Sequence, residues 1–345
     1  MSFIRNCWYF AAWADELGEG ERLARRIIGD PLLFWRQGGR LYAVTDSCPH
    51  RLAPLHMGRT EGETVHCGYH GLAFDGATGK CVHNPHGPIT GALSIRAYPL
   101  VERHGVIWIW MGDADRADPA AIPDMGFIDE APEHAFSKGY MYSAAGHKLL
   151  EDNILDLSHA DYLHPATLGG GSITRTKAHV EERGDTLFVR WLAKDERAIP
   201  IFRPELPDPD MAADMWTEVL WHPDGVMLLR VGASPAGEPR EAGIDTMNAH
   251  VMTPETETTT HYFYCNSRNY RVDDADYNAG MAKGLRIAFE TEDKPMIEAQ
   301  QRALGDVDLF ERKPALLGID NGSTRARRIY RRLVDAEAAP ISEPV

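Results

Sequence analysis

The chain has 345 residues, of which 43% are hydrophobic and 25% charged, and its formal net charge is −15 at pH 7. This length and balance predict a globular protein with room for two domains. The acidic excess argues against nucleic acid as a partner, because phosphate binding needs clusters of Lys and Arg. No apolar run reaches the length of a membrane span, and the first residues lack the pattern of a secretion signal.

The first third of the chain has the pattern of short strands joined by turns. Apolar runs rich in β-branched and aromatic residues lie at 32–35, 41–44 and 106–110, and Gly38-Gly39 marks a hairpin between the first two runs. No helical period of useful length occurs before about residue 112. We therefore expect an all-β domain over residues 1–112 and a second domain over residues 113–345.

Two short motifs in the first domain each combine one cysteine with one histidine. They are Cys48-Pro-His50 and Cys67-Gly-Tyr-His70. This spacing suits a Rieske [2Fe–2S] cluster, in which one iron takes both thiolates and the other takes both imidazoles. A zinc site is the alternative, since zinc also accepts two Cys and two His. We favour the Rieske cluster because zinc fingers usually pair like ligands, whereas each half here supplies one of each.

The five cysteines of the chain bear on whether the protein works in a reducing or an oxidising compartment. Two of them are needed as thiolates, and no spacing pairs the others as disulfides. A reducing environment is therefore favoured, and we expect a cytoplasmic protein.

The second domain is expected to open with a strand at 140–145 and a helical stretch around 149–163. Alternating strands should follow, with candidates at 186–192, 215–221, 226–231, 246–253 and 258–266. A final helical region is expected over 279–304, with Pro295 kinking or interrupting it.

The helical stretch at 149–163 carries a second group of polar residues. Asn153, Asp156 and His159 are three apart and would share one face of a helix. Pro165 disfavours helix at His164, so this imidazole can turn back towards His159. Two imidazoles and a carboxylate make the facial triad of non-haem Fe(II) oxygenases. Two such histidines alone would more often be core or capping residues, but electrons from an upstream cluster need an acceptor.

With both motifs, the whole chain resembles the oxygenase components of the Rieske non-haem iron oxygenases. It is most similar to the branch with vanillate and dicamba O-demethylases and toluenesulfonate methyl-monooxygenase. Besides the metal motifs, the resemblance is carried by residues 3–9, 84–87, 106–112 and 148–156. It implies an α+β fold, with an N-terminal all-β Rieske domain and a helix-grip catalytic domain of antiparallel sheet plus a long C-terminal helix.

The resemblance also implies a third iron ligand, an aspartate on a C-terminal helix. Asp293 in Glu290-Thr-Glu-Asp293 is the matching residue, and Glu290 and Glu292 are rivals if the alignment slips. The mononuclear iron would then be held by His159, His164 and Asp293.

Asp156 and Asn153 are the catalytic candidates beside this iron. Asp156 matches a bridging carboxylate, which links a cluster histidine of one subunit, here His70, to an iron-ligand histidine of the next, here His159. A carboxylate between two imidazoles would fix both tautomers. Such a link across a subunit boundary implies a homotrimer.

The implied function is that of a terminal oxygenase, which uses O2 and electrons from NAD(P)H delivered by a separate reductase or ferredoxin. We expect oxidative O-demethylation of a methoxylated aromatic acid. The alternatives are hydroxylation of an aryl methyl group and hydroxylation of an aromatic ring. A Rieske electron-transfer protein without catalysis is a further class, but it would leave the second motif without a role.

Candidate substrate residues come from the strands and the final helix of the second domain. Leu229, His250 and Gly284 match the substrate contacts of the dicamba enzyme, where the residues are Asn, His and Trp. Only His250 keeps its type, so dicamba itself is not expected, and Gly284 should leave more room. Arg230 could pair with a substrate carboxylate or sulfonate, or could face outward on its strand.

Overall fold

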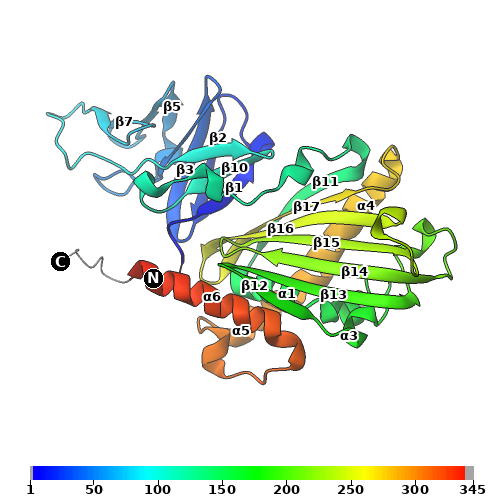
Figure 1. The fold of residues 1–345 in the computed structure, drawn as a ribbon. Helices are drawn as coiled ribbons and strands as arrows, with labels where there is room; N and C mark the ends of the chain where they lie inside the picture. The colour runs from blue at the N-terminus through cyan, green and yellow to red at the C-terminus, as the bar shows by residue number, and fades with distance from the viewer. Residues whose placement is uncertain (1–2, 339–345) are drawn as a thin grey trace. The chain divides into compact units, whose positions relative to one another are not determined.

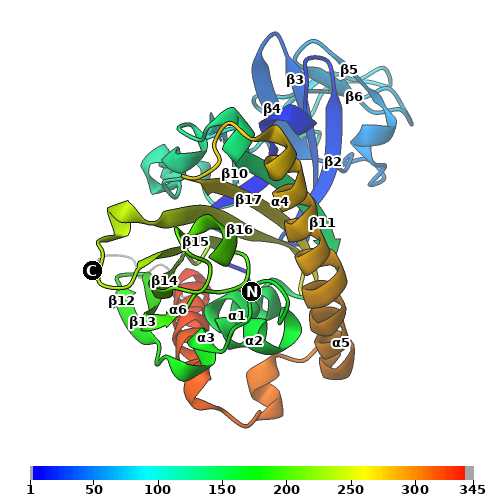
Figure 2. The same cartoon turned by 90° about the vertical axis from the view of Figure 1, so that its right-hand side faces the viewer.

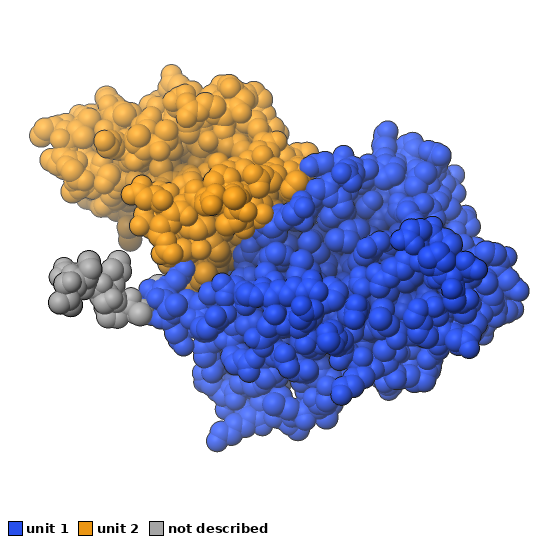
Figure 3. Space-filling model, in the orientation of Figure 1, with its two compact units in different colours: residues 1–2, 123–345 blue, residues 3–122 orange. Residues whose placement is uncertain are grey.

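The computed structural model describes residues 3–338, and the remaining residues, including 339–345 of the expected second domain, lie outside this range. Contacts between Cα atoms divide the chain into two compact units, Phe3–Ile122 and a second unit that begins at Pro123 (Figure 3). The division falls after residue 122, whereas the sequence placed it after residue 112.

Side chains of the first unit hold the segment that follows residue 112. The indole nitrogen of Trp110 donates to the carbonyl oxygen of Asp113 at 2.7 Å, and that of Trp8 donates to Asp118 at 2.8 Å. Short 3-10 turns capped by the two aspartate side chains make up this segment. It therefore packs as part of the first unit.

The first unit consists of three small antiparallel sheets (Figure 1). One has the order β1-β10-β9, one the order β2-β3-β4, and the third the order β5-β6-β7-β8. Gly38 and Gly39 both have positive φ, 59° and 74°, and form the expected two-residue hairpin between β3 and β4. The strands are β1 (Trp8–Trp13), β2 (Arg22–Ile27), β3 (Asp30–Gln37), β4 (Arg40–Thr45), β5 (Arg59–Glu61), β6 (Thr64–His66), β7 (Ala73–Asp75), β8 (Cys81–His83), β9 (Leu100–Arg103) and β10 (Val106–Trp110).

The second unit is built on a seven-stranded antiparallel sheet of order β11-β17-β16-β15-β14-β13-β12 (Figure 1). Its strands are β11 (Phe136–Ser143), β12 (His179–Arg183), β13 (Thr186–Arg197), β14 (Ala212–Trp221), β15 (Val226–Pro235), β16 (Ile244–Thr256) and β17 (Thr259–Arg268). Its helices are α1 (His147–Leu155), α2 (Ala160–Leu163), α3 (Ser172–Arg175), α4 (Ala275–Ile287), α5 (Lys294–Leu304) and α6 (Asn321–Ala338).

Helices cover one face of this sheet. α1 contacts β14 and β16, α4 contacts β11, and α6 contacts β13, while α4 and α5 follow one another along the sheet (Figure 2). Side chains of α1 and α4 line the same cavity as inward-facing residues of β13 to β17. The expected α+β class is confirmed, with an all-β first unit and a sheet gripped by helices in the second. No helix within residues 3–338 is long and apolar enough to cross a membrane.

The helical stretch expected at 149–163 is interrupted, so that prediction was wrong in one respect. α1 ends at Leu155, and Asp156 has extended φ and ψ of −127° and 90°. The Asp156 carboxylate accepts from the backbone N–H of Ser158 at 3.0 Å and so begins a new turn. Because Asp is favoured at helix N-caps, this break is local in origin. Asn153, Asp156 and His159 therefore do not share the face of one helix.

The C-terminal helical region also differs from the expectation. It begins at Ala275, and a π-helical segment, Ala288–Asp293, joins α4 to α5. A proline within a helix disturbs the carbonyl four residues earlier, here that of Thr291 in the π-helical segment, so the interruption expected from Pro295 is present. The π-helical segment ends on Asp293.

α6 was not anticipated from the sequence. Its buried residues Ala326, Ile329, Tyr330 and Val334 have the spacing of an amphipathic helix. That periodic signal was present in the sequence among many arginines.

Candidate metal centres and substrate cavity

Two equivalent loops carry the cysteines of the first motif pair. Each cysteine N–H donates to a carbonyl five residues later, from Cys48 to Ala53 at 2.9 Å and from Cys67 to Leu72 at 2.8 Å. Both side chains are buried, in a core that includes Trp35. Burial raises the pKa of the Cys48 thiol, and the neighbouring Cys67 raises it further, although the backbone N–H of His50 opposes both effects. Two thiols held together in an apolar core fit a metal that keeps them as thiolates.

The two histidines of these motifs lie together nearer the surface. The ring centroids of His50 and His70 are 4.6 Å apart, and His50 is exposed. Burial and the neighbouring imidazole of His50 lower the pKa of His70, which favours the neutral form that binds metal. The structure thus brings together two cysteines and two histidines, the donor set of a Rieske cluster.

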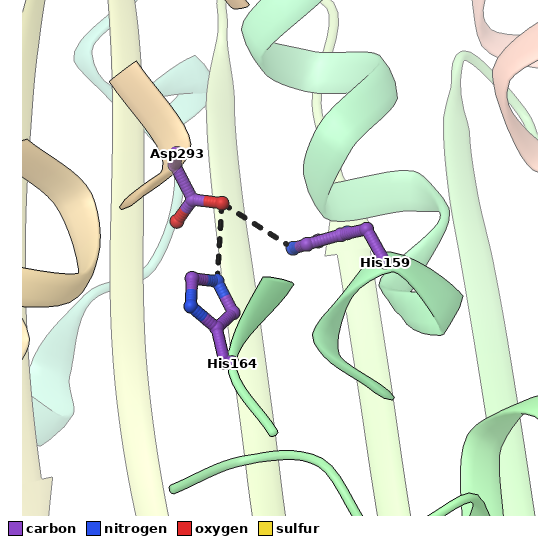
Figure 4. Close-up of side chains that lie close together, drawn as sticks. All are labelled: His159, His164 and Asp293. Carbon is purple, nitrogen blue, oxygen red and sulfur yellow. Dashed lines mark hydrogen bonds and ion pairs between the residues drawn. The ribbon is translucent and has the colours of Figure 1, made fainter. Parts of the chain in front are cut away.

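A second donor set lies in the other unit. One donor atom each of His159, His164 and Asp293 lies within 4.8 Å of the other two (Figure 4). Oδ1 of Asp293 is 3.1 Å from Nε2 of His164 and 3.6 Å from Nε2 of His159. His159 comes from the turn after Asp156, His164 from the end of α2, and Asp293 from the π-helical segment. Two imidazoles and one carboxylate converging in this way fit a mononuclear iron.

The outer nitrogen of each imidazole in this triad is already bound. Nδ1 of His159 lies 2.7 Å from the backbone carbonyl oxygen of Asp156, which can only accept, so this nitrogen carries the proton. Nδ1 of His164 lies 2.6 Å from Oε2 of Glu292. Both Nε2 atoms are therefore left to face Asp293 and a metal. Burial lowers the pKa of His164, but Asp293 and Glu292 outweigh burial, so the net shift is upward.

The three carboxylates considered as the third ligand have different environments. Asp293 is buried beside both histidines, Glu292 contacts the outer side of His164, and Glu290 is exposed. The amide nitrogen of Asn153 lies 3.4 Å from Oδ1 of Asp293. The geometry therefore places Asp293 as the donor and Glu292 as the partner that orients His164.

Asp156 differs from its expected arrangement. The resemblance implied that its carboxylate binds His159, but the contact is made by its backbone carbonyl oxygen. The carboxylate caps the next turn through Ser158 and borders a groove that also includes Asn153 and His159. The break in the helix causes this, because it turns the backbone of Asp156 towards the imidazole.

A cavity of about 140 Å³ lies between the sheet and the helices, and the triad forms part of its wall. Its lining is mainly apolar, with Leu157, Trp191, Ile199, Phe202, Met215 and Phe289 among the contributors. Two of the expected substrate residues, Leu229 and His250, line it.

The other two expected substrate residues do not line this cavity. Arg230 points to the opposite face of β15, where its Nη2 is 2.5 Å from Oδ2 of Asp245. Strand alternation is the cause, since Leu229 and Val231 face the cavity. Gly284 is exposed, and Leu285 of the same helix lines the cavity instead. Arg230 therefore takes the outward direction, one of the two that the sequence left open, and Gly284 does not contribute to the described cavity wall.

His250 is a buried polar residue on the sheet side of the cavity. Its Nδ1 is 2.7 Å from the hydroxyl of Tyr262, and its ring packs edge-on against Phe289. Burial lowers the pKa of His250 to about 4, so the imidazole is neutral near pH 7. It can therefore offer one hydrogen bond to a substrate without adding charge.

Two cavity residues, Asn248 and Asn266, were missed by sequence reasoning. Both are buried on the sheet beside His250. The signal was available, because an amide at an inward position of an otherwise apolar strand is unusual.

Known proteins share this architecture over nearly the whole chain. The Rieske [2Fe-2S] domain family matches residues 7–99, and the vanillate O-demethylase oxygenase C-terminal domain family matches residues 143–336. The oxygenase component of dicamba O-demethylase from Stenotrophomonas maltophilia is 38% identical over 344 residues, which cover 98% of this chain and 100% of the relative. The iron–sulfur subunit of the toluene-4-sulfonate monooxygenase system from Comamonas testosteroni is 36% identical and covers 97% and 98%.

Solved structures give the same result. Dicamba monooxygenase bound to 3,6-dichlorosalicylic acid superposes with a TM-score of 0.88 at 35% identity, covering 99% of this chain and all of that one. A further structure of that enzyme, with non-haem iron and dicamba, has a TM-score of 0.79 at 35% identity and covers 98% and 99%.

Proposed function

We propose a reaction for this chain from the premise that it belongs to the Rieske non-haem iron oxygenases, as an oxygenase component of the vanillate O-demethylase branch. The proposed reaction is oxidative O-demethylation of a methoxylated aromatic compound, with O2 and electrons from NAD(P)H. One observation carries it: the triad of His159, His164 and Asp293 forms part of the wall of an apolar cavity. A cavity of about 150 Å³ holds one benzene ring, so this cavity has room for the aromatic ring of a single-ring substrate.

The residues of the chain have distinct tasks in this reaction. An iron bound by the triad would supply the chemistry, activating O2 so that the methyl C–H bond is oxidised to a hemiacetal that releases formaldehyde. Asp293 and the two Nε2 atoms hold the metal, while Glu292 and the carbonyl of Asp156 fix the imidazoles. The apolar lining excludes bulk water from the oxidising site.

A substrate carboxylate is not part of this proposal. None of the described residues lining the cavity is Lys or Arg, and Arg230 is paired with Asp245 on the other face of the sheet. The proposal therefore covers the aromatic ring and its methoxy group.

The electron supply and the assembly complete the proposal. A separate reductase or ferredoxin reduces the cluster, for which the exposed imidazole of His50 provides access. We assign Asp156 the task of joining the cluster of one subunit to the iron of the next in a homotrimer, and its partly exposed carboxylate on a groove supports this. Five free cysteines support a cytoplasmic setting.

The test is reconstitution of the iron-loaded protein with a reductase and NADH. Formaldehyde and product mass would be followed over methoxy- and methyl-substituted aromatic compounds. We expect formaldehyde to rise in step with oxygen uptake for a methoxy substrate. A product that gains one oxygen without formaldehyde would overturn demethylation and favour the hydroxylation of an aryl methyl group or a ring.

A further inference from the structure

Three neighbouring strands place a short row of amide groups in the wall of the cavity that the metal triad also borders. Leu229 of β15 pairs with Asn248 of β16, which pairs with Asn266 of β17. Residues paired in this way point to the same face of a sheet, and all three line the cavity. The two asparagines are 7% and 3% exposed. Their hydrogen bonds are therefore made within the protein or to a bound molecule.

The direction of this amide chain is fixed by a backbone group. Nδ2 of Asn248 donates to the carbonyl oxygen of Leu229 at 3.0 Å, and a carbonyl can only accept. Oδ1 of Asn248 must then face Asn266, from whose Nδ2 it accepts at 2.6 Å. Neither amide can be reversed without placing two donors or two acceptors together.

The last group in this row of amides is a hydrogen-bond acceptor that has no partner among the described residues. Oδ1 of Asn266 is buried and has no hydrogen-bond partner among the described residues, and Asn266 is one of the residues in the cavity wall. A buried carbonyl oxygen left in this state costs free energy, which a ligand with an N–H or O–H group would recover. Nε2 of His250, two residues from Asn248 and on the same face of β16, also has no partner within residues 3–338.

The charges around this acceptor do not favour an anion. No Lys or Arg side chain lines the described cavity, and His250 is neutral near pH 7. Asp293 and Glu292 offset the charge of a ferrous ion held by the triad. A carboxylate or sulfonate entering here would lose its hydration, meet the negative end of the Asn266 amide, and find no Lys or Arg side chain in the described lining.

We propose that the cavity selects a neutral aromatic substrate that presents an N–H or O–H donor to Oδ1 of Asn266, such as a methoxyphenol or a methoxyanilide. This rests on the proposed function, whose substrate class it narrows. Asn266 is a specificity-determining residue, and Asn248 positions it through the carbonyl of Leu229.

Four matched ethers test the proposal with the unaltered protein. They are 2-methoxyphenol and 2-methoxyacetanilide, which carry a donor, 1,2-dimethoxybenzene, which has none, and 2-methoxybenzoate, which is anionic. Binding to the anaerobic, iron-loaded oxygenase is measured by calorimetry, and formaldehyde release is measured with reductase and NADH. We expect at least one donor-bearing ether to bind about tenfold or more tightly than 1,2-dimethoxybenzene, and the benzoate to bind most weakly. Equal binding of all four, or tightest binding of the benzoate, would overturn the proposal.

The variant Asn266→Leu tests the residue itself. It removes the acceptor and keeps the branched shape of the side chain, so the preference for a donor should fall about tenfold while 1,2-dimethoxybenzene binds as before or more tightly. An unchanged preference would show that a group other than Asn266 accepts the hydrogen bond from the ether, which would overturn the proposal. Cluster absorbance and iron content report whether the variant is folded, and if it is not, the four-ether series still decides.

The two proposals fail in different ways. If no ether yields formaldehyde, demethylation fails, but the ranking by calorimetry still tests the donor preference. If formaldehyde is released and the anionic ether ranks first, only the substrate class proposed here fails.

Discussion

The two metal sites of this chain are built in opposite ways. The cluster ligands come from two neighbouring loops with buried cysteines and a surface histidine, whereas the triad gathers residues from the region after α1 and from a π-helical segment far along the chain. No described carboxylate binds the ring nitrogens of His50 or His70, while Glu292 binds His164. An electron relay needs access, and an oxygenating site needs an enclosed, rigid donor set. The two sites should therefore respond differently to substitution.

The largest effect is expected from Asp293→Ala. It removes a donor of the triad, so the second iron should be lost and turnover should fall by more than about 100-fold, beyond the cost of losing a ligand's outer partner. Cluster absorbance should stay unchanged, because the cluster ligands lie in the other unit. Iron analysis and spectroscopy together measure both sites.

Glu290→Gln is the matched control for this substitution. Glu290 lies in the same π-helical segment but is exposed, so iron content and turnover should stay at the wild-type level. If Glu290→Gln loses iron and Asp293→Ala retains it, the assignment of the third ligand is wrong.

A smaller loss is expected from Glu292→Gln. The neutral amide weakens the hold on Nδ1 of His164, and such outer partners typically contribute 10- to 100-fold, about one to two orders of magnitude, in metal affinity or activity. Iron affinity measured by competition with a chelator would show it. Wild-type affinity in Glu292→Gln would mean that packing alone orients His164.

The variant Asp156→Asn distinguishes the role of the Asp156 backbone carbonyl from the role of its carboxylate. The variant keeps the backbone contact to His159 and an acceptor for Ser158, so iron content should not change. Electron transfer from the reduced cluster to the iron should slow by about tenfold if the carboxylate joins the two sites as proposed. Rapid-mixing spectroscopy measures that rate, and loss of iron would instead show that the carboxylate supports the metal.

The smallest effect on turnover is expected from Glu151→Gln, which acts on stability. Glu151 is buried in α1 and accepts from Trp221 at 2.8 Å, and burial raises its pKa to about 8. In the unfolded chain the pKa is about 4.3, so between the two values the folded state binds the extra proton. The contribution of this group to stability therefore falls as pH rises through that window, by at most about 1.4 kcal/mol per pH unit.

Glu151→Gln removes this titration. Relative to the wild type, its melting temperature should rise between pH 5 and 8, which are about the limits of the window. Asp224, whose pKa burial raises to about 7, still titrates in the variant, so a shallower slope should remain. Parallel curves for the two proteins would contradict the assignment.

The sequence determined the chemistry of the metal ligands because their spacing is mostly local. Cys48 and Cys67 with their partner histidines lie in two short motifs, and His159 and His164 lie in a third. The all-β first unit and the helix-covered sheet also followed from periodicity and from the resemblance, and the structure confirms them. Asp293 required the resemblance, since a lone acidic residue on a helix carries no metal signal of its own.

Tertiary structure decided which atoms of these and other residues face one another. Arg230 has apolar neighbours on both sides in β15, so the sequence left open which face of the sheet its side chain is on. Only the pairing of β15 with β14 and β16 decides that the Arg230 side chain points away from the cavity. The hydrogen bond that Nδ1 of His159 donates to the backbone carbonyl of Asp156 depends on a helix break, which the periodicity of the sequence could not show. The unpartnered oxygen of Asn266 depends on a chain of contacts across three strands. Strand register is a long-range property, and it set the polarity of this cavity.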